Sequence, residues 1–350
     1  MPVQLEERRA APPKKKALIR APRDYSQRLR RAFQLAFFAL NVWIGVQFVR
    51  FVHYYETGAS PATVARPAGV EGWLPIASLM NLKALLATGV WPHVHPAGVV
   101  LLIAFLAISW LFRKSFCSWL CPVGTLSEYL WRLGRSTFKK NWRIPRILDI
   151  PLRALKYALL GLFVYAIAGM SVAAIRAFLD GPYGLIADVK LLNFFRYLGA
   201  GGATTLLVLV VLSVFIQNFW CRYLCPYGAL LGLLSMASPL RIRRNAGLCI
   251  DCGKCARECP SRLPVDQLVT IQSAECTACL ECVASCPVDQ ALVIAAPRSR
   301  AVPVWAVACG IAMIFFGLYG WALATGHWHT NLPDRVYMEL VPRANEFSHP

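Results

Sequence analysis

The sequence predicts an all-α membrane protein that carries a small α+β insert. Of its 350 residues, 57% are hydrophobic and only 16% are charged, and the mean hydropathy is +0.48. Soluble domains of this length rarely reach such values, whereas membrane proteins with several spans commonly do. Two further observations complete the prediction. A dense run of cysteines lies between residues 249 and 287, and a shorter cysteine motif occurs twice before it.

Five segments are apolar enough to cross a bilayer, whose hydrocarbon core requires about 20 apolar residues in a helix. The predicted spans are residues 32–52, 97–112, 152–172, 203–219 and 302–323. The first four would form a membrane domain over residues 32–239, and the fifth would follow the insert. The loops after the first and third spans each hold a shorter amphipathic segment, residues 74–86 and 185–195. Both segments are too short to span, so we expect interfacial or re-entrant helices there.

The distribution of Lys and Arg predicts the orientation in the membrane. Residues 1–31, 113–156 and 220–300 hold 29 of the 37 Lys and Arg residues, and such residues concentrate on the cytoplasmic side. We therefore expect the basic tail, residues 1–31, and the insert, residues 240–300, to be cytoplasmic. The short tail at residues 324–350 would then lie outside. The net charge of +19 is thus a topology signal, and it does not indicate a nucleic-acid partner.

The cysteine run contains the motif C-x2-C-x2-C-x3-C-P twice. Bacterial ferredoxins use this spacing to bind two [4Fe–4S] clusters, each held by three thiolates of one motif and the fourth thiolate of the other. Zinc sites usually need only two CxxC pairs, and disulfide frameworks seldom repeat in this way. The crossing rule assigns Cys249, Cys252, Cys255 and Cys286 to cluster 1, and Cys276, Cys279, Cys282 and Cys259 to cluster 2.

A second motif, CxxxCP, follows the second and the fourth predicted span. The segments FCSWLCPVGTLS and WCRYLCPYGALL agree at their Cys, aromatic, Leu, Pro and Gly positions. The order of helix, amphipathic segment, helix and CxxxCP therefore occurs twice in the same direction, which predicts a parallel two-fold repeat. Such a repeat would bring four thiols together at the cytoplasmic ends of two spans: Cys117, Cys121, Cys221 and Cys225.

Three roles are open for these four thiols. They could hold a metal centre, either a further iron–sulfur cluster or copper, because thiolates select soft metals. They could form a redox-active dithiol pair, or they could be small buried side chains at a helix bend. The repetition at matching membrane depth, beside the ferredoxin motif, favours a metal or redox role.

Two histidines on the predicted outer side are weaker candidates. His93 and His95 lie beside Trp91 and Pro96, and an imidazole there could contact a quinone or a metal ion. Aromatic and histidine-rich segments at a membrane boundary more often serve as interfacial anchors. The sequence contains no Gly-rich dinucleotide fingerprint and no CxxCH haem motif, and no acid–base group is predicted to be catalytic.

The segments RKSFCSWLCPVGTLSE and CRYLCPYGALLG, together with the double ferredoxin motif, resemble the NapH/NosR/CcoG-type polyferredoxin membrane proteins. In overall length and in the segment RPAGVEGWLPIASLMNLKALLATG, the chain most resembles the YccM-type putative electron transport proteins. The resemblance implies an electron-transfer subunit of the bacterial inner membrane, with relatives that oxidise quinol or supply electrons to periplasmic reductases. Large extracytoplasmic domains of the NosR and CcoG types are not recognisable here, so their copper-handling roles are not implied directly.

We therefore expect a membrane-bound relay through two [4Fe–4S] clusters and a CxxxCP centre. It would pass electrons between the quinone pool or a periplasmic redox protein and a cytoplasmic carrier. An electron-transfer subunit is favoured over a stand-alone enzyme. Two alternatives stay open, namely a quinol dehydrogenase or metal-ion reductase in its own right, and a redox-sensing assembly or regulatory factor.

Overall fold

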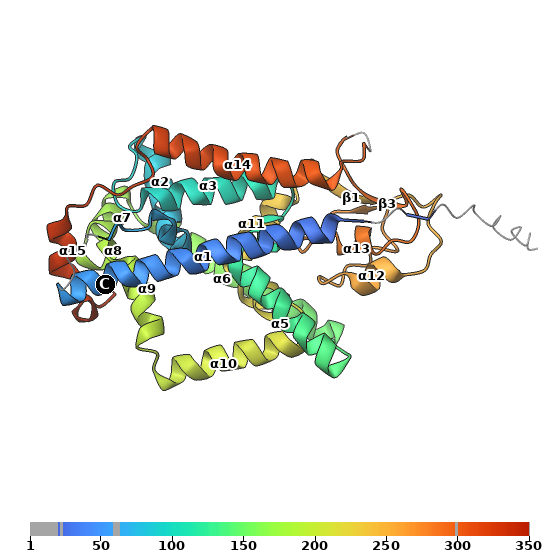
Figure 1. Ribbon diagram of the computed structural model, residues 1–350, viewed down its shortest axis with the longest axis horizontal. Coiled ribbons are helices and arrows are strands. Elements are labelled where there is room, and N and C mark those ends of the chain that lie inside the picture. The colour runs from blue at the N-terminus through green and yellow to red at the C-terminus, as the bar shows by residue number, and fades with distance from the viewer. Residues whose placement is uncertain (1–19, 22–23, 59–63, 298–299, 350) are drawn as a thin grey trace, which may run out of the picture.

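The computed structural model describes residues 20–21, 24–58, 64–297 and 300–349. Most of the predicted basic tail, residues 1–31, lies outside the described residues. The molecule is elongated (Figure 1). Two long helices, α1 (Ser26–Thr57) and α14 (Val304–Ala324), run along it from the cysteine-rich insert at one end to a group of short helices at the other.

Three described helices are long and apolar enough to cross a membrane: α1, α6 (Arg146–Gly169) and α14. The pair α9 (Ala187–Arg196) and α10 (Ala200–Phe215) is bent by 83° and would supply a fourth crossing if it counts as one span. Helix α3 (Pro96–Leu111) is apolar but has only 16 residues. The protein is therefore a multi-pass membrane protein, and the number of five spans stays a prediction.

Helix α3 is enclosed by protein. It packs against α2 (Pro75–Thr88), α11 (Pro226–Ser235), α14 and the 3-10 helix η1 (Ala68–Trp73), and much of its surface is buried, Ala97 and Val99 completely. Helices α6 and α10 instead expose large apolar side chains such as Tyr165 and Leu207. Apolar side chains on an outer helix surface are what lipid contact requires.

Each CxxxCP motif forms a short turn between two longer helices. The first is α4 (Phe116–Trp119), which leads into α5 (Pro122–Phe138), and the second is the π-helical turn η2 (Trp220–Leu224), which leads into α11. Helix α1 packs against α4 and α5, as α6 packs against η2 and α11. The helix before each CxxxCP motif packs against the helix that follows the other motif: α3 packs against α11, and α10 packs against α5. The two CxxxCP motifs and their flanking helices are thus packed in the same way on each other.

The insert is a small α+β unit. Its elements are β1 (Arg241–Arg244), α12 (Lys254–Glu258), β2 (Thr270–Ile271), α13 (Glu281–Ala284) and β3 (Leu292–Ala295). The strands form an antiparallel sheet in the order β2–β1–β3. Ile242 on the central strand is paired with Ile271 and Ile294, and all three side chains are buried. This alternation gives the sheet an apolar face on which the cysteine loops pack.

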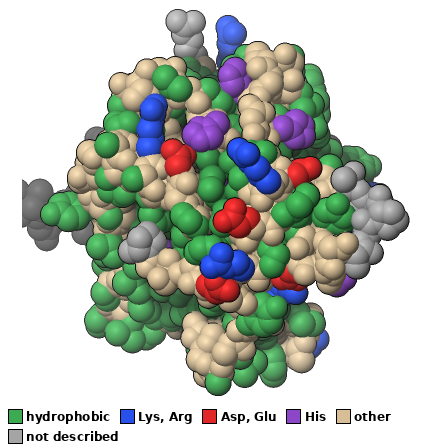
Figure 2. Space-filling view, turned by 90° about the vertical axis from the view of Figure 1, so that its left-hand side faces the viewer, with side chains coloured by type: hydrophobic (Ala, Val, Ile, Leu, Met, Phe, Trp, Pro, Cys, Tyr) green, Lys and Arg blue, Asp and Glu red, His purple; other side chains and the backbone are tan. Residues whose placement is uncertain are grey.

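The end opposite the insert is a packed cap. The predicted amphipathic segments are helical: α2 covers residues 75–88, and α7 (Val172–Leu179), α8 (Pro182–Leu185) and α9 follow α6. The C-terminal segment, expected to be a plain tail, forms α15 (Asp334–Leu340) and the 3-10 helix η4 (Ala344–Glu346). The Tyr337 ring lies edge-on to Phe51 of α1, with centroids 5.2 Å apart. Figure 2 looks onto this cap, where acidic, basic and histidine side chains are mixed with hydrophobic ones.

Candidate metal centres and the cavity beside them

The two cysteine loops of the insert share one backbone shape. On both sides of the second cysteine of each motif the backbone has positive φ: 53° and 65° at Asp251 and Gly253, and 49° and 60° at Ala278 and Leu280. Left-handed residues placed in this way turn successive N–H groups toward one concave side, which is the backbone nest that favours anionic groups such as iron–sulfur clusters. Both loops therefore have a shape that suits a cluster.

The fourth cysteine of each motif lies near the other motif. Burial raises the pKa of Cys286, and the charges of Cys252 and Cys249 raise it further. Burial likewise raises the pKa of Cys259 to about 11, with a further contribution from Cys276. These neighbours are the ones that the crossing rule requires, and the full ligand sets stay predictions. Among the described residues, no group of three or more His, Cys, Asp or Glu side chains has the geometry to hold a metal ion.

The second cysteine of each CxxxCP motif caps the helix that follows. The Cys121 Sγ accepts a hydrogen bond from the Gly124 N–H at 3.4 Å at the start of α5, and the Cys225 Sγ accepts one from the Gly228 N–H at 3.2 Å at the start of α11. A proline occupies the first turn of each helix, where its missing N–H costs nothing. Each of these sulfurs lies at the start of a helix, where the positive end of the helix dipole favours negative charge, so both positions are suited to a metal ligand.

The four CxxxCP thiols are partly buried and lie close enough to affect one another's pKa. Burial raises the pKa of Cys117 to about 11 and that of Cys121 to about 12. It also raises the pKa of Cys221, to which the charges of Cys225, Cys121 and Cys117 contribute. Such thiols stay protonated unless a metal displaces the proton, because metal binding and thiol deprotonation are linked. The chemistry of this donor set therefore fits a thiolate-bound metal centre.

The first CxxxCP motif is hydrogen-bonded to the second cysteine loop of the insert. The Ser118 Oγ donates to the Thr277 carbonyl at 2.6 Å, and the Trp119 Nε1 donates to the Ala278 carbonyl at 3.2 Å. Both donors lie between the two cysteines of the motif, and both acceptors lie between Cys276 and Cys279. The two candidate centres are thereby held next to each other.

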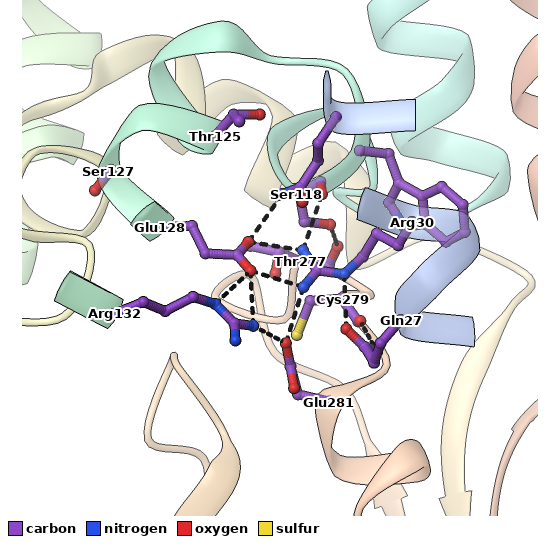
Figure 3. Close-up of polar contacts among 12 residues, drawn as sticks. Gln27, Arg30, Ser118, Thr125, Ser127, Glu128, Arg132, Thr277, Cys279 and Glu281 are labelled. Atoms are coloured by element: carbon purple, nitrogen blue, oxygen red, sulfur yellow. Dashed lines mark hydrogen bonds and ion pairs between the residues drawn. The ribbon is translucent and has the colours of Figure 1, made fainter. Parts of the chain in front are cut away.

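An ion cluster fastens the same loop to α1 and α5 (Figure 3). The buried Arg30 of α1 donates from Nη1 and Nη2 to the two carboxylate oxygens of Glu128 on α5, both at 2.7 Å, and from Nη2 to Glu281 on α13 at 2.8 Å. Arg132 also pairs with Glu128 and Glu281. Gln27 donates to a carbonyl of the loop at 2.9 Å. These contacts make the insert part of the helix bundle rather than a freely tethered domain.

The second half of the molecule is anchored in a similar way. Lys156 of α6 places its Nζ 2.6 and 2.7 Å from the two carboxylate oxygens of Glu275, the residue before the second ferredoxin motif. Arg222, inside the second CxxxCP motif, pairs with Asp149 at 2.9 Å and donates to the Ser261 carbonyl at 2.9 Å. Both CxxxCP motifs thus contact the insert directly or through a buried ion pair.

A cavity of about 800 Å³ lies beside these centres. Its inner wall includes all four CxxxCP cysteines and Cys279 of the second ferredoxin motif. Ile44, Leu101 and Phe105 belong to its apolar middle, and Arg66 and Trp328 belong to its outer end. The lining residues Trp43 and Phe316 are 58% and 55% exposed, so part of the wall is accessible from the apolar surface of α1 and α14.

At the outer end, Arg66 is the centre of a buried ion cluster. Its Nη1 donates to Glu71 at 2.6 Å and its Nη2 donates to Asp188 at 2.6 Å. The His95 Nδ1 lies 3.4 Å from the Arg66 Nη2 and 3.7 Å from the Glu71 Oε1. The His95 Nε2 is 2.8 Å from the Gly184 carbonyl, to which it donates. His95 is thus locked into a polar network and is not among the residues that line the cavity.

The other predicted outer residue, His93, is exposed and pairs with Asp180 at 3.3 Å. Neither histidine lines the cavity, and a quinone or metal contact for them stays a prediction. Sequence reasoning missed Arg66, Glu71 and Asp188, and it also missed Lys156 and Glu275. One signal was present, because a charged residue within a hydrophobic segment, such as Lys156, marks a functional or paired position.

The cysteine segments match two family models. A model described as a 4Fe-4S binding domain matches residues 94–145 and again residues 198–245, so each match contains one CxxxCP motif. A model described as a 4Fe-4S dicluster domain matches residues 241–287, the ferredoxin motifs. Iron–sulfur clusters are therefore cofactors of this chain.

Similarity to other proteins extends well beyond these domains. The chain is 48% identical to the putative electron transport protein YccM of Escherichia coli over 326 residues, which cover 91% of both chains. It is 24% identical to the ferredoxin-type protein NapH of the same organism, over 75% of this chain and 86% of NapH. It is 30% identical to the protein NirI of Paracoccus denitrificans, over 61% of this chain and 31% of NirI. No solved structure matches the chain.

The similarity to YccM covers nearly the whole of both proteins, and it agrees with the double ferredoxin motif, the paired CxxxCP motifs and the membrane helices. The chain belongs to the YccM branch of the NapH/NosR-type family and is a membrane-bound iron–sulfur electron-transfer protein.

Proposed function

We propose that this chain passes electrons between a cytoplasmic carrier and a quinone that binds in the cavity. The eight ferredoxin cysteines would hold two [4Fe–4S] clusters, and the four CxxxCP cysteines would hold a further iron–sulfur centre. When bound, these groups supply one-electron transfer. One observation supports the proposal most directly: Cys279 and all four CxxxCP cysteines border the same cavity, which the apolar middle section then extends toward the outer end.

The protein itself would fix positions and exclude water. Ser118 and Trp119 hold the second cysteine loop against the first CxxxCP motif, which keeps the two centres at a constant separation. The reciprocal packing of the CxxxCP groups and the repeated family match support the predicted two-fold repeat. The positive charge of the segments beside the insert supports a cytoplasmic location for the insert and an outer location for the C-terminus.

A quinone suits the cavity in size and chemistry. Sites for small apolar ligands occupy several hundred Å³, are lined mainly by hydrophobic and aromatic side chains, and contain a few polar groups. Here Asn41 and Gln47 of α1 lie among aromatic and aliphatic residues. The exposed Trp43 and Phe316 at the wall face the region where lipid would lie, so a lipid-soluble ligand can enter without crossing water.

The quinone site can be tested by narrowing the cavity. Ile44→Trp adds bulk to the cavity wall, and Val46→Trp places the same side chain at an exposed position of the same helix. Purified protein is mixed with a short-chain quinol, and reduction of its clusters is followed by their visible absorbance. We expect Ile44→Trp to slow this reduction at least about tenfold, equivalent to about 1.4 kcal/mol, and Val46→Trp to leave it unchanged. Reduction by dithionite serves as the control for intact clusters.

Equal reduction rates in both variants would contradict quinone binding in this cavity. Turnover of quinol by the isolated chain with an added acceptor would make the protein a quinol dehydrogenase in its own right.

The further centre can be tested by metal content. Two [4Fe–4S] clusters alone account for about eight irons and about eight sulfides per chain. We expect a clear excess in the wild type and its loss in a variant in which Cys117, Cys121, Cys221 and Cys225 are all Ser. Equal iron in the two proteins would contradict an iron–sulfur centre at these thiols and leave copper or a dithiol as explanations, which copper analysis separates.

A further inference from the structure

Lys114 is a buried lysine with no hydrogen-bonded or ion-paired partner among the described residues. The residue is only 3% exposed and lines the inner end of the cavity. Within the part of the chain that the structure describes, its Nζ forms no hydrogen bond and no ion pair. A buried ammonium group is costly unless anionic or polar groups compensate for its lost hydration. The carboxylate that its charge reaches, Glu275, is shared with Lys156, so the position favours a further anion.

The ammonium group faces the CxxxCP thiols. A Cβ atom placed on Gly228, in the first turn of α11, would lie 3.5 Å from the Cys225 Sγ and 3.6 Å from the Lys114 Nζ. The sulfur and the nitrogen therefore approach the same point at the start of this helix. Burial raises the pKa of the Cys117 and Cys221 thiols, and the positive charge of Lys114 opposes this rise.

The surrounding charges do not neutralise Lys114. Glu275 is engaged through both carboxylate oxygens by Lys156. Burial alone would raise the pKa of Glu275, but the ammonium groups of Lys114 and Lys156 together hold it below its usual value. Arg222 is matched by Asp149, and Arg113 has no acidic partner among the described residues. Two lysines thus share one carboxylate, and the inner end of the cavity is left with excess positive charge.

We infer that Lys114 is the charge-compensating residue of an anionic, thiolate-held centre at Cys117, Cys121, Cys221 and Cys225, and that it raises the reduction potential of that centre. This inference rests on the proposed iron–sulfur centre. Four thiolates outweigh the positive charge of an iron–sulfur core, so the occupied site is negative, and one added electron makes it more negative. A fixed cation beside the centre favours both charge states of the occupied site over the empty site, and it favours the reduced state most.

Three single variants separate charge from packing. Lys114→Met removes the charge and keeps most of the volume, and Lys114→Arg keeps the charge. Lys83→Met removes a lysine at the outer side, where Lys83 donates to the carbonyls at the end of α6, and serves as the control. Iron and sulfide are measured per chain, and a redox titration follows the EPR signal that is absent from the quadruple Ser variant.

We expect Lys114→Met to lower the potential of this signal, or to lower its iron occupancy severalfold, while the eight ferredoxin irons are retained. Lys114→Arg and Lys83→Met should resemble the wild type. An unchanged potential at full occupancy in Lys114→Met would overturn the inference. An equal loss of iron occupancy in Lys114→Arg would also overturn it, because the site would then require the shape of the lysine side chain and not its charge.

A comparison of thermal unfolding midpoints tests the charge of Lys114 in protein that lacks the proposed iron–sulfur centre. In the quadruple Ser background no anion can form, so Lys114→Met should raise the unfolding midpoint by removing an uncompensated buried charge. A fall in the midpoint in that background would show a purely structural lysine and overturn the inference. If instead the wild type shows neither the signal nor excess iron, the proposed centre itself fails, which is a different result.

Discussion

The two ends of the cavity both carry buried charges, but the charges are paired at the outer end and incompletely paired at the inner end. At the outer end, the outer cluster consists of Arg66, Glu71, Asp188 and His95, and every charged group in it has a partner within 4 Å. At the inner end, Lys114 lies beside four cysteine thiols and has no acidic partner within 4 Å in the described part of the chain. Both ends are buried within the protein.

The contrast separates a structural charge cluster from a binding site. The outer cluster joins η1, α3 and α9, and its charges balance when His95 is protonated, so it is complete as it stands. The inner end is balanced only when a negative ligand is present. A charge cluster that is complete within the protein indicates stability, whereas an incomplete one indicates what binds there.

The largest expected effect comes from breaking the outer cluster. Arg66→Met would leave the buried carboxylates of Glu71 and Asp188 with His95 as the one remaining cationic group of the cluster. Removal of one partner from a buried ion pair typically costs about 3–5 kcal/mol, so we expect the thermal midpoint in detergent to fall by many degrees. Arg343→Met is the control, because Arg343 and Glu346 form an exposed pair and exposed pairs contribute about 1 kcal/mol or less. Similar midpoints for the two variants would contradict a structural role for the outer cluster.

A smaller effect tests how tightly the backbone is packed at each CxxxCP motif. A Cβ atom at Gly124 would lie 2.1 Å from the Cys117 carbonyl oxygen, whereas at Gly228 it would meet its nearest neighbours at ordinary contact distances. We expect Gly124→Ala to cost about 1–3 kcal/mol, as overpacking does, and to lower the excess iron. Gly228→Ala, the equivalent change in the other motif, should have a smaller effect on both. Equal losses would show that the two motifs are equally constrained, contrary to the packing.

The sequence predicted the parts of the site that depend on local spacing. The ferredoxin motifs and the CxxxCP motifs are recognisable because most of the cysteines within each motif lie only a few residues apart, and this spacing can be read directly from the sequence. The α+β character of the insert follows from the same motifs. The apolar helices were found from composition, and α3 differs from the predicted span by one residue at each end, whereas α1 begins at residue 26 and extends to residue 57.

The charge clusters could not be predicted, because their members are far apart in the chain. Arg66 is separated from Asp188, and Lys156 from Glu275, by more than 100 residues, and nothing in the local sequence specifies these pairs. The docking of α15 was missed for a related reason. Tyr337 lies in a polar, proline-containing segment, and its contact with Phe51 depends on tertiary packing.

The smallest expected effect is a pH dependence at the outer cluster. Burial and the nearby Arg66 lower the pKa of His95, but the hydrogen bond and charge of Glu71 and the charge of Asp188 outweigh them, so the folded-state pKa is raised. The Tyr337 ring approaches the same group of charges from α15. An unfolded histidine has a pKa of about 6.5. The stabilisation from protonated His95 is therefore complete below about pH 6.5 and is lost as the pH rises through the folded-state pKa.

His95→Gln tests this pH dependence. The variant cannot take up the proton, so its midpoint should lie below that of the wild type under mildly acidic conditions by about 1 kcal/mol, the contribution of a typical hydrogen bond. The difference should shrink as the pH rises, because the wild type then loses the same charge. The carboxylate of Glu71, whose pKa is lowered despite burial by Arg66 and His95, stays ionised throughout. His93→Gln is the matched control at an exposed histidine, and a pH-independent difference for His95→Gln would show that the ring acts only through its bond to Gly184.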